Sequence, residues 1–396
     1  MARRTAGRKE VKENKKPRKS RLILVSGTYF DYPLLFLIVF LAGMGLLMVY
    51  SASYYASTIK YNDSSFFFMK QLKISLAGLA VMLVVSCIKY QIYNTKLIYL
   101  GLLLGGVLMV LLKLKGKEVN GSQRWLIIGG VSIQPSEIIK IVLILFVAYL
   151  LTQYSGELNT LWGSAKILFI PLIFVVLIAI ENLSSAIICF AIIMVMFFVA
   201  TPKPFMVIGL GLFGLALLVG SVFMVGYRSS RIDAWLHPET ADKGYQVMQS
   251  LYAVGSGGLF GRGLGQSIQK MGFVPEAYND MIFSIICEEL GVIGAAGIII
   301  VFIMLLWRLK FIVEGAPDRF GAFIVVGVIA HIAVQVIVNI GVVTNTIPNT
   351  GVTLPFISYG GTSLLLLLAE MGIVLAVSKQ IRPAKNIDEE TGLQNG

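Results

Sequence analysis

Charged residues, cysteines and histidines are all scarce in this chain. Only 14% of its 396 residues are Asp, Glu, Lys or Arg, whereas 57% are hydrophobic, and an ordinary soluble domain has roughly 25% charged residues. This composition excludes soluble and disordered proteins. Three widely separated cysteines exclude a disulfide framework and a cysteine zinc knuckle. The two histidines, His237 and His331, are expected to be structural, because no second ligand stands at helical spacing from His331.

Long apolar stretches take the place of the missing charge. A hydrocarbon core of about 30 Å needs about 20 apolar residues per helix. Ten stretches approach that length, near 33–52, 72–88, 97–114, 137–153, 165–181, 183–200, 205–226, 284–307, 320–344 and 361–378. The sequence therefore predicts an all-α polytopic membrane protein with about ten transmembrane helices. The polar corner at Glu181 and Asn182 predicts a tight hairpin between the fifth and sixth helices.

The basic residues predict how the chain is oriented. Lys and Arg outnumber Asp and Glu by 33 to 21, mostly at the ends and loops of apolar stretches, which indicates topology rather than nucleic-acid binding. With both termini cytoplasmic, 20 Lys and Arg lie inside and 13 outside, as the positive-inside rule requires. We expect a basic cytoplasmic tail at 1–25, a membrane domain at 26–380 and a cytoplasmic tail at 381–396.

One connection, 227–283, is much longer than ordinary loops and is predicted on the extracytoplasmic side, between the seventh and eighth helices. It carries a glycine series that permits turns or close approach to a ligand. Cations outside the membrane oppose the orientation rule, so they are candidates for holding an anionic group such as phosphate. These cations are Lys113, Lys115, Lys117, Arg124, Arg228, Arg231, Lys243, Arg262 and Lys270. For the 113–117 run, contact with lipid headgroups is an equal alternative.

Asp280 is the candidate functional acid. A helix beginning near Asp280 would place Asp280, Ser284 and Glu288 on one face, with Asp280 about 12 Å above Glu288 at the water interface. An N-cap role for Asp280 is the alternative. Glu289, on the opposite face, is expected to pair with a polar group of another helix.

Two further segments are expected beside the same face of the membrane. Glu137 and Lys140 form an i, i+3 pair at the start of the fourth helix, where a structural role is the alternative to a functional one. The connection at 339–363 is uncharged but rich in glycine, proline and hydroxyl side chains. Irregular backbone at membrane depth must be buried in protein or line a polar cavity, so we expect a re-entrant segment beside a substrate pocket.

Several motifs together resemble one family. They are Arg124-Trp125, Gln134-Pro135-Ser136-Glu137, Gly244-Tyr245-Gln246, Pro275-Glu276, Asp280-Met281-Ile282-Phe283-Ser284, Glu288-Glu289 and Ser358-Tyr359-Gly360-Gly361. The sequence resembles the SEDS family (shape, elongation, division and sporulation), which includes FtsW, RodA and SpoVE, over nearly the whole membrane region. Two departures from the family pattern occur, at 277–279 and at 181–184, but the acid itself is kept.

The resemblance implies a GT-C-like peptidoglycan glycosyltransferase that polymerises lipid II during septal cell-wall synthesis and cell division. The long basic N-terminal tail favours the FtsW branch. By family analogy Asp280 is the general base of an inverting transfer. The residues expected to bind substrate are Lys117, Arg124, Glu137, Arg228, Arg231, Gln246, Arg262, Glu288, Ser358 and Tyr359.

The resemblance also implies ligands and partners. The ligands are lipid II, undecaprenyl diphosphate and membrane lipids, with a divalent cation, Mg or Mn, as an open alternative to having no cofactor. The partners are a class B penicillin-binding protein transpeptidase and divisome proteins, with no nucleic acid. The expected location is the bacterial cytoplasmic membrane, with the active site on its extracytoplasmic face. Two other functions stay open, a lipid II flippase and a noncatalytic scaffold that activates a partner synthase.

Overall fold

The computed structural model describes residues 30–119, 122–128, 131–220, 226–241 and 244–381. Within them, eight helices are long and apolar enough to cross a membrane, and two shorter apolar helices accompany them. The eight are α1 (Tyr32–Tyr61), α2 (Phe66–Ser86), α3 (Ile98–Lys115), α4 (Pro135–Gln153), α5 (Leu161–Glu181), α6 (Leu183–Ala200), α10 (Ile282–Gly315) and α11 (Arg319–Val343). The shorter two are α7 (Pro204–Gly220) and α12 (Thr362–Ser378). Each of the ten predicted stretches coincides with a helix over its described residues, with 221–225 of the seventh lying outside them, so the predicted polytopic fold is confirmed.

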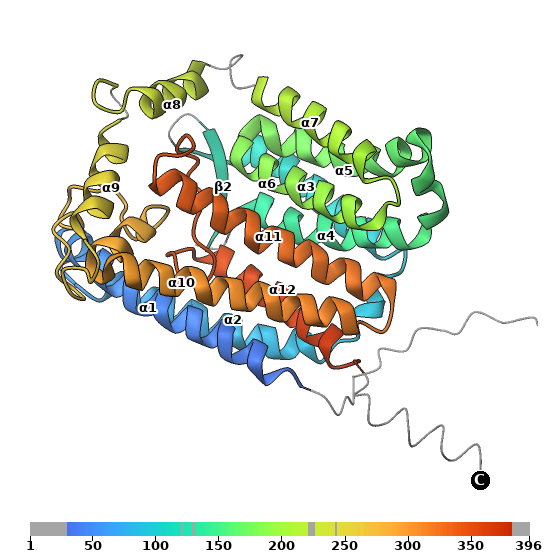
Figure 1. Cartoon of the computed structure of the whole chain (residues 1–396), viewed down its shortest axis with the longest axis horizontal. Coiled ribbons are helices and arrows are strands. Elements are labelled where there is room, and N and C mark those ends of the chain that lie inside the picture. Colours follow the sequence, from blue (N-terminus) through green and yellow to red (C-terminus); the bar gives the residue numbers. More distant parts are fainter. Residues whose placement is uncertain (1–29, 120–121, 129–130, 221–225, 242–243, 382–396) are drawn as a thin grey trace, which may run out of the picture.

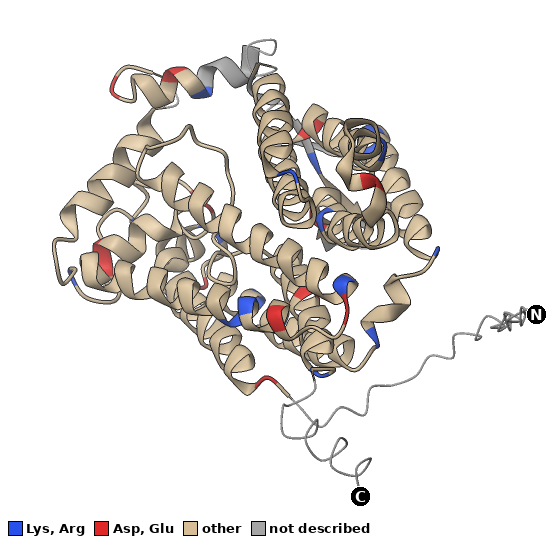
Figure 2. Cartoon of the chain, turned by 45° about the vertical axis from the view of Figure 1, so that its right-hand side comes forward, with Lys and Arg blue, Asp and Glu red and all other residues tan. Residues whose placement is uncertain are grey.

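The helices form one bundle with α11 at its centre (Figure 1). α11 packs against α4, α6, α10 and α12, while α2 lies along α12 and α1 along α10. Long uncharged stretches of helix separate the few charged positions (Figure 2). Many large apolar side chains point outward, among them Phe36, Leu103, Phe169 and Phe213. Such a surface is stable only in contact with lipid, which agrees with a multi-pass membrane protein.

Several helices begin where a side chain satisfies the first free backbone N–H groups. Asp31 accepts from the Leu34 N–H at 3.0 Å, and Asp318 accepts from the Gly321 N–H at 2.7 Å. Asn182 accepts from the Ser185 N–H at 3.2 Å, and it is the single residue between α5 and α6. The predicted hairpin is therefore confirmed, and its cap explains why the two helices can turn so tightly.

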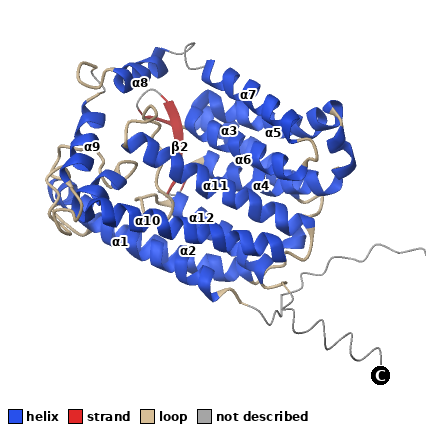
Figure 3. Cartoon of the chain, viewed as in Figure 1, coloured by secondary structure: helices blue, strands red, loops and turns tan. Residues whose placement is uncertain are grey.

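The connections hold more structure than the sequence predicted. The segment between α3 and α4 forms a small antiparallel sheet of β1 (Lys117–Val119), β2 (Ser122–Ile128) and β3 (Val131–Ile133) (Figure 3). The long connection after α7 contains two further helices, α8 (Gly226–Leu236) and α9 (Tyr245–Ser256). Val247, Ser250 and Ala253 line the buried face of α9. These amphipathic helices lie at the end of the bundle where α10 begins, which we call the α9 end (Figure 1).

Helix α10 is broken at Gly291, where φ is 69° and ψ is −172°. The break frees two carbonyl groups and two N–H groups that a continuous helix would pair. Loop residues take up all four: Arg262 N–H donates to Glu288 O at 2.9 Å and Gly263 N–H to Glu289 O at 3.0 Å. In return, Val292 and Ile293 donate to the carbonyls of Gly258 and Leu259 at 2.9 and 3.1 Å. The break and the glycine-rich loop therefore require each other.

The glycine series supplies a test of this interlock. Gly261 and Gly265 have nearly the same left-handed φ, 77° and 79°, but a Cβ on Gly261 would overlap the Glu289 carbonyl, whereas a Cβ on Gly265 meets open space. We expect Gly265→Ala to cost about 1–2 kcal/mol, the strain of the backbone alone. Gly261→Ala should cost about 4 kcal/mol or more, because the loop must leave α10. Thermal unfolding in detergent would measure both, and equal losses would contradict the interlock.

Candidate active site

Asp280 lies in a turn directly before α10, at the α9 end of the bundle. The helix begins at Ile282, with Met281 as the capping residue and no side-chain cap, so the N-cap alternative for Asp280 is wrong. Its side chain is half-buried. Gly351, from the connection between α11 and α12, faces the carboxylate so closely that a Cβ there would lie 3.7 Å from Asp280 Oδ2. The acid is therefore enclosed on one side by backbone from a distant part of the chain.

The connection at 344–361 is the backbone wall of this site. Although it forms no regular secondary structure beyond turns, Leu354, Phe356 and Ile357 are buried. Ser358 Oγ accepts from the Leu354 N–H at 2.8 Å, and the Tyr359 N–H donates to the Tyr278 carbonyl at 2.9 Å. The segment is thus embedded in protein, as expected of irregular backbone at membrane depth.

A polar face of α11 holds this wall in place. His331, Gln335 and Asn339 stand at i, i+4 and i+8, and all three are buried. Asn339 Nδ2 donates to the Asp280 carbonyl and to the Val352 carbonyl, both at 2.7 Å. Gln335 Nε2 donates to the Thr353 carbonyl at 3.0 Å. One face of one helix therefore fixes both Asp280 and the wall opposite it.

Two of the predicted binding residues reach the same wall from the long connection. Arg231 on α8 donates through Nη1 to the Asn349 carbonyl at 3.0 Å. Gln246 on α9 accepts from Asn349 Nδ2 at 3.2 Å and donates to the Pro275 carbonyl at 3.4 Å. Asn349 thus joins α8, α9 and the wall. Asp280, Arg231 and Gln246 are brought together by this arrangement.

The environment of Asp280 alters its acidity. Burial raises the pKa of the carboxyl from 3.8 to about 6. Hydrogen bonds from backbone N–H groups oppose this, the nearby carboxylate of Glu276 raises the pKa further and the Arg231 guanidinium lowers it. A carboxylate with this pKa is ionised at neutral pH yet takes up a proton readily, which are the properties of a general base.

Tyr359 and Ser358 have structural contacts. Tyr359 packs edge-on against Phe67 and Tyr278, with ring centroids 5.2 and 5.7 Å away, and Phe67 stacks on Tyr278 at 4.5 Å. Ser358 is buried, and its carbonyl accepts from Gln71 Nε2 at 3.2 Å. Both residues therefore shape the wall and the segment before Asp280. Their predicted role in binding substrate stays a prediction.

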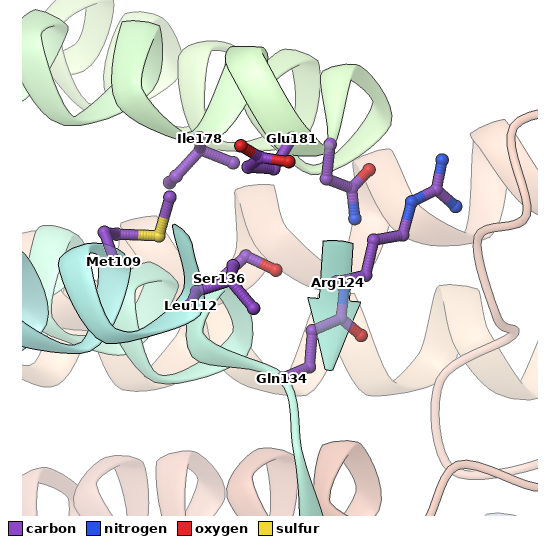
Figure 4. A pocket seen from close by; sticks show the side chains of 8 residues that line it. Met109, Leu112, Arg124, Gln134, Ser136, Ile178 and Glu181 are labelled. Carbon is purple, nitrogen blue, oxygen red and sulfur yellow. The ribbon is translucent and has the colours of Figure 1, made fainter. Parts of the chain in front are cut away.

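Arg124 on β2 lines a separate small cavity at the same end of the bundle (Figure 4). The polar side chains around it are Gln134, Ser136, Glu181 and Asn182. At the rim, Lys113 pairs with Glu181 at 3.1 Å. The cavity therefore combines Arg124, the ion-paired Glu181 and hydrogen-bonding side chains where α3, α4 and α5 meet the small sheet.

Glu288 is fully buried and serves the glycine-rich loop. Its carboxylate accepts from Ser267 Oγ and from the N–H groups of Ile268 and Gln269, and Arg262 Nε lies 3.7 Å from it. Four donors occupy about all the lone pairs that a carboxylate offers. Glu288 and Arg262 therefore hold the loop, and their predicted contact with substrate stays a prediction.

Glu289 is buried beside Glu288 and ties the loop to α1. Lys270 Nζ lies 2.8 Å from its carboxylate, and Ser51 on α1 donates to it at 2.6 Å. The expectation that Glu289 pairs with a polar group of another helix is confirmed. Of the remaining predicted residues, Lys117 begins β1 and Arg228 lies in α8, but their side chains are outside the described part of the structure, as is Lys243.

Four ionisable side chains meet inside the bundle, and we call them the charged quartet: Glu137, Lys140, His331 and Glu370. Lys140 Nζ lies 2.9 Å from Glu137 and 3.1 Å from His331 Nε2, and His331 Nδ1 lies 2.9 Å from Glu370. Because an ammonium only donates, Nε2 accepts and Nδ1 carries the hydrogen donated to Glu370. The quartet joins α4, α11 and α12.

Only part of the quartet could be predicted from the sequence. The Glu137 and Lys140 pair follows from i, i+3 spacing, and His331 is structural as expected. Its contact with Glu370 was missed, because the partners stand on different helices. A signal existed, however: a charged residue in the apolar run of α12 needs a partner. Glu137 also accepts from Ser363 Oγ at 3.0 Å, so the quartet reaches the start of α12 beside the wall.

These features define a multi-pass membrane protein with a half-buried acid at one end of its bundle. The family model described as cell cycle protein, for FtsW, RodA and SpoVE, matches residues 32–383. The chain belongs to this family.

Relatives in two branches are similar over nearly their whole length. Stage V sporulation protein E of Bacillus subtilis is 41% identical over 364 residues, which cover 89% of this chain and 98% of that protein. The probable peptidoglycan glycosyltransferase FtsW of Trichlorobacter lovleyi is 36% identical over 366 residues, 90% of this chain and 94% of that protein. The choice of the FtsW branch therefore stays a prediction.

Solved structures share the fold. A chain of a peptidoglycan synthase complex, described as coordinating polymerisation and crosslinking, superposes with a TM-score of 0.75 at 26% identity over 89% of this chain and 99% of that chain. The rod shape determining protein RodA of Thermus thermophilus superposes with a TM-score of 0.67 at 25% identity, over 90% of this chain and 99% of that chain.

The charged quartet should respond to removal of its cation. Lys140→Met leaves two carboxylates in an apolar bundle and should lower stability by about 3–5 kcal/mol. The double variant Glu137→Gln, Lys140→Met removes one of those charges and should regain part of the loss. Thermal unfolding in detergent would compare them. A double variant that is less stable than Lys140→Met alone would contradict the pairing.

Proposed function

We propose that this protein is a peptidoglycan polymerase that transfers lipid-linked disaccharide-pentapeptide units into glycan chains for septal cell-wall synthesis. The observation that carries the proposal is the half-buried Asp280, with a pKa raised to about 6, facing the 344–361 wall. The family and its relatives named peptidoglycan glycosyltransferase support the same reaction.

In this mechanism Asp280 acts as the general base. Its ionised carboxylate takes the proton from an acceptor sugar hydroxyl as that oxygen attacks the anomeric carbon of the donor. The glycosidic bond forms while the bond to the polyprenyl diphosphate breaks, and the electron pair leaves with the diphosphate. A single carboxylate suffices for this single displacement, which inverts the anomeric centre; a double displacement would also need a nucleophile.

The diphosphate needs positive charge more than it needs an acid. Arg231 lies beside the wall and acts electrostatically on Asp280, so it is one candidate for stabilising the negative charge of the diphosphate. Arg124 and Lys113 gather at the neighbouring cavity. Among the described residues no cluster of three or more His, Cys, Asp or Glu could hold a metal ion. A divalent cation therefore stays a proposal, and the diphosphate itself would supply ligands to it.

The site is proposed to face the outside of the cytoplasmic membrane, with both termini cytoplasmic. The even number of apolar helices within the described residues and the distribution of Lys and Arg support this orientation. A class B penicillin-binding protein is the proposed partner, since the similar chain with the TM-score of 0.75 belongs to a complex that couples polymerisation to crosslinking.

The two alternatives predict other properties of the site. A flippase needs polar access from both sides, but the quartet residues Lys140, His331 and Glu370 are buried and paired with one another. A noncatalytic scaffold would need no ionised acid at position 280.

Asp280→Asn should abolish polymerisation, because the amide keeps the shape but cannot accept the proton. The loss of a general base costs about 10²- to 10⁴-fold in rate. Glycan synthesis from lipid II by purified protein with its partner transpeptidase measures this, with Glu276→Gln as the matched carboxylate control. Near-normal turnover by a folded Asp280→Asn protein would reject the base and favour the scaffold.

The rate should also fall as the pH drops through about 6, because protonated Asp280 cannot act as a base. Glu276→Gln removes a charge that raises the Asp280 pKa, so the acid limb should move to lower pH. Arg231→Gln removes a charge that lowers this pKa, so the limb should move to higher pH. The pH dependence of kcat/KM tests both shifts, and movement in the same direction would contradict the assignment.

A further inference from the structure

An open apolar groove of about 580 Å³ runs between α3 and α5. Leu103, Gly106 and Val110 line it from α3, and Ile170 and Phe174 line it from α5. Leu103 and Val110 are largely exposed, so the groove faces the lipid rather than the bundle interior. Tyr99 and Leu111 lie at its two ends on α3, which are about 18 Å apart at the helical rise.

The groove leads toward the polar cavity of Arg124. On α5 the residues Ile170, Phe174, Ile178 and Glu181 stand at i, i+4, i+8 and i+11, which is one face of the helix. The first two line the groove, and the last two line the cavity. The same seam between α3 and α5 is therefore apolar along its length and polar where it meets the small sheet, and Figure 4 shows the polar end.

The polar end suits an anionic headgroup. Arg124 lines the cavity and Lys113 stands at its rim, paired with Glu181. The cavity is small, about 10 Å³, which is room for about one water-sized group. A phosphate oxygen fits there, so a larger headgroup would lie at the mouth of the cavity with its remaining atoms toward solvent.

The shape of the seam depends on glycine. A Cβ at Gly106 would meet nothing within 4 Å, so the missing side chain leaves space on the groove face of α3. One residue earlier, a Cβ on Gly105 would lie 3.3 Å from Ile139 and 3.7 Å from Phe174, so this glycine lets α3 approach its neighbours. A larger side chain at position 106 would therefore fill the groove without disturbing the packing at position 105.

We propose that the α3/α5 groove binds the first part of the polyprenyl chain of a lipid-linked substrate, with its diphosphate at the mouth of the Arg124 cavity. The inference rests on the proposed function and adds a tail site to it. An apolar chain with a diphosphate at one end matches a seam that is apolar along its length and carries Arg124 and the Lys113–Glu181 ion pair at one end. An ordinary phospholipid shares this chemistry, and the experiment separates the two sources.

The test fills the groove and changes the length of the tail. Gly106→Leu is compared with Gly297→Leu, a control at a glycine of α10 whose Cβ also meets open space. Both variants and the wild type are assayed with donors that carry a long polyprenyl tail or a short one. We expect Gly106→Leu to raise KM for the long-tail donor about tenfold, leaving kcat and the short-tail donor unchanged. Gly297→Leu should change neither KM.

Three results would overturn the proposal. They are an unchanged KM in Gly106→Leu, an equal rise in KM for both tail lengths, and an equal rise in Gly297→Leu.

Wild-type protein that polymerises neither donor would instead reject the proposed function, and the groove is then tested by binding alone. A polyprenyl diphosphate with a photoreactive group in its first isoprene units should crosslink to α3 or α5 in wild type but not in Gly106→Leu. If excess phospholipid abolishes the crosslinking as well as excess unlabelled polyprenyl diphosphate does, the groove is assigned to ordinary lipid.

Discussion

The break in α10 imposes the constraint on which the site depends. At Gly291 the backbone leaves the helical path inside a membrane protein, where water cannot satisfy the freed groups. The loop at 258–263 supplies the missing partners, and the side chains of Glu288 and Glu289 then bind the loop residues that follow. Because Asp280 lies in the chain between this loop and the break, the backbone on both sides of the acid is held by these hydrogen bonds.

The polar face of α11 is the second support of the site. Asn339 bonds to backbone on both sides of the site, and Gln335 holds the wall one turn below. His331 continues the same face into the charged quartet. Helix α11 thus connects the reactive end to the middle of the bundle through one polar face, on which Asn339 contacts Asp280 directly and Gln335 and His331 continue toward the quartet.

The sequence predicted the helices well because long apolar runs and basic ends are local signals. All ten predicted helices exist, and the Asn182 corner needed only its own cap. The small sheet and the helices α8 and α9 were missed, because the strands are short and the two helices, of 11 and 12 residues, are amphipathic rather than long apolar runs. The N-cap alternative for Asp280 is wrong, because α10 starts after it, while the role of Asp280 as the functional acid stays a proposal.

Contacts between side chains of different segments were harder to predict than the positions of single residues. Glu288 looks like a site carboxylate in the sequence, and only the fold shows that residues 262–269 surround it. The contact of His331 with Glu370 spans 39 residues, and its contact with Lys140 spans 191. Such pairings depend on which helices become neighbours, and no spacing within one helix reveals that.

The separation of 191 residues between Lys140 and His331 affects how the helices can insert into the membrane during synthesis. During synthesis Lys140 enters the bilayer with α4, long before the helix that carries His331 has emerged. Glu137 is the partner it has from the start, since it lies on the same helix. The i, i+3 pair can thus act as an internal counterion that lets α4 insert early, and the last helix, α12, closes the network by delivering Glu370. A truncated chain without α12 would keep the imidazole in the membrane but lose the carboxylate that orients it.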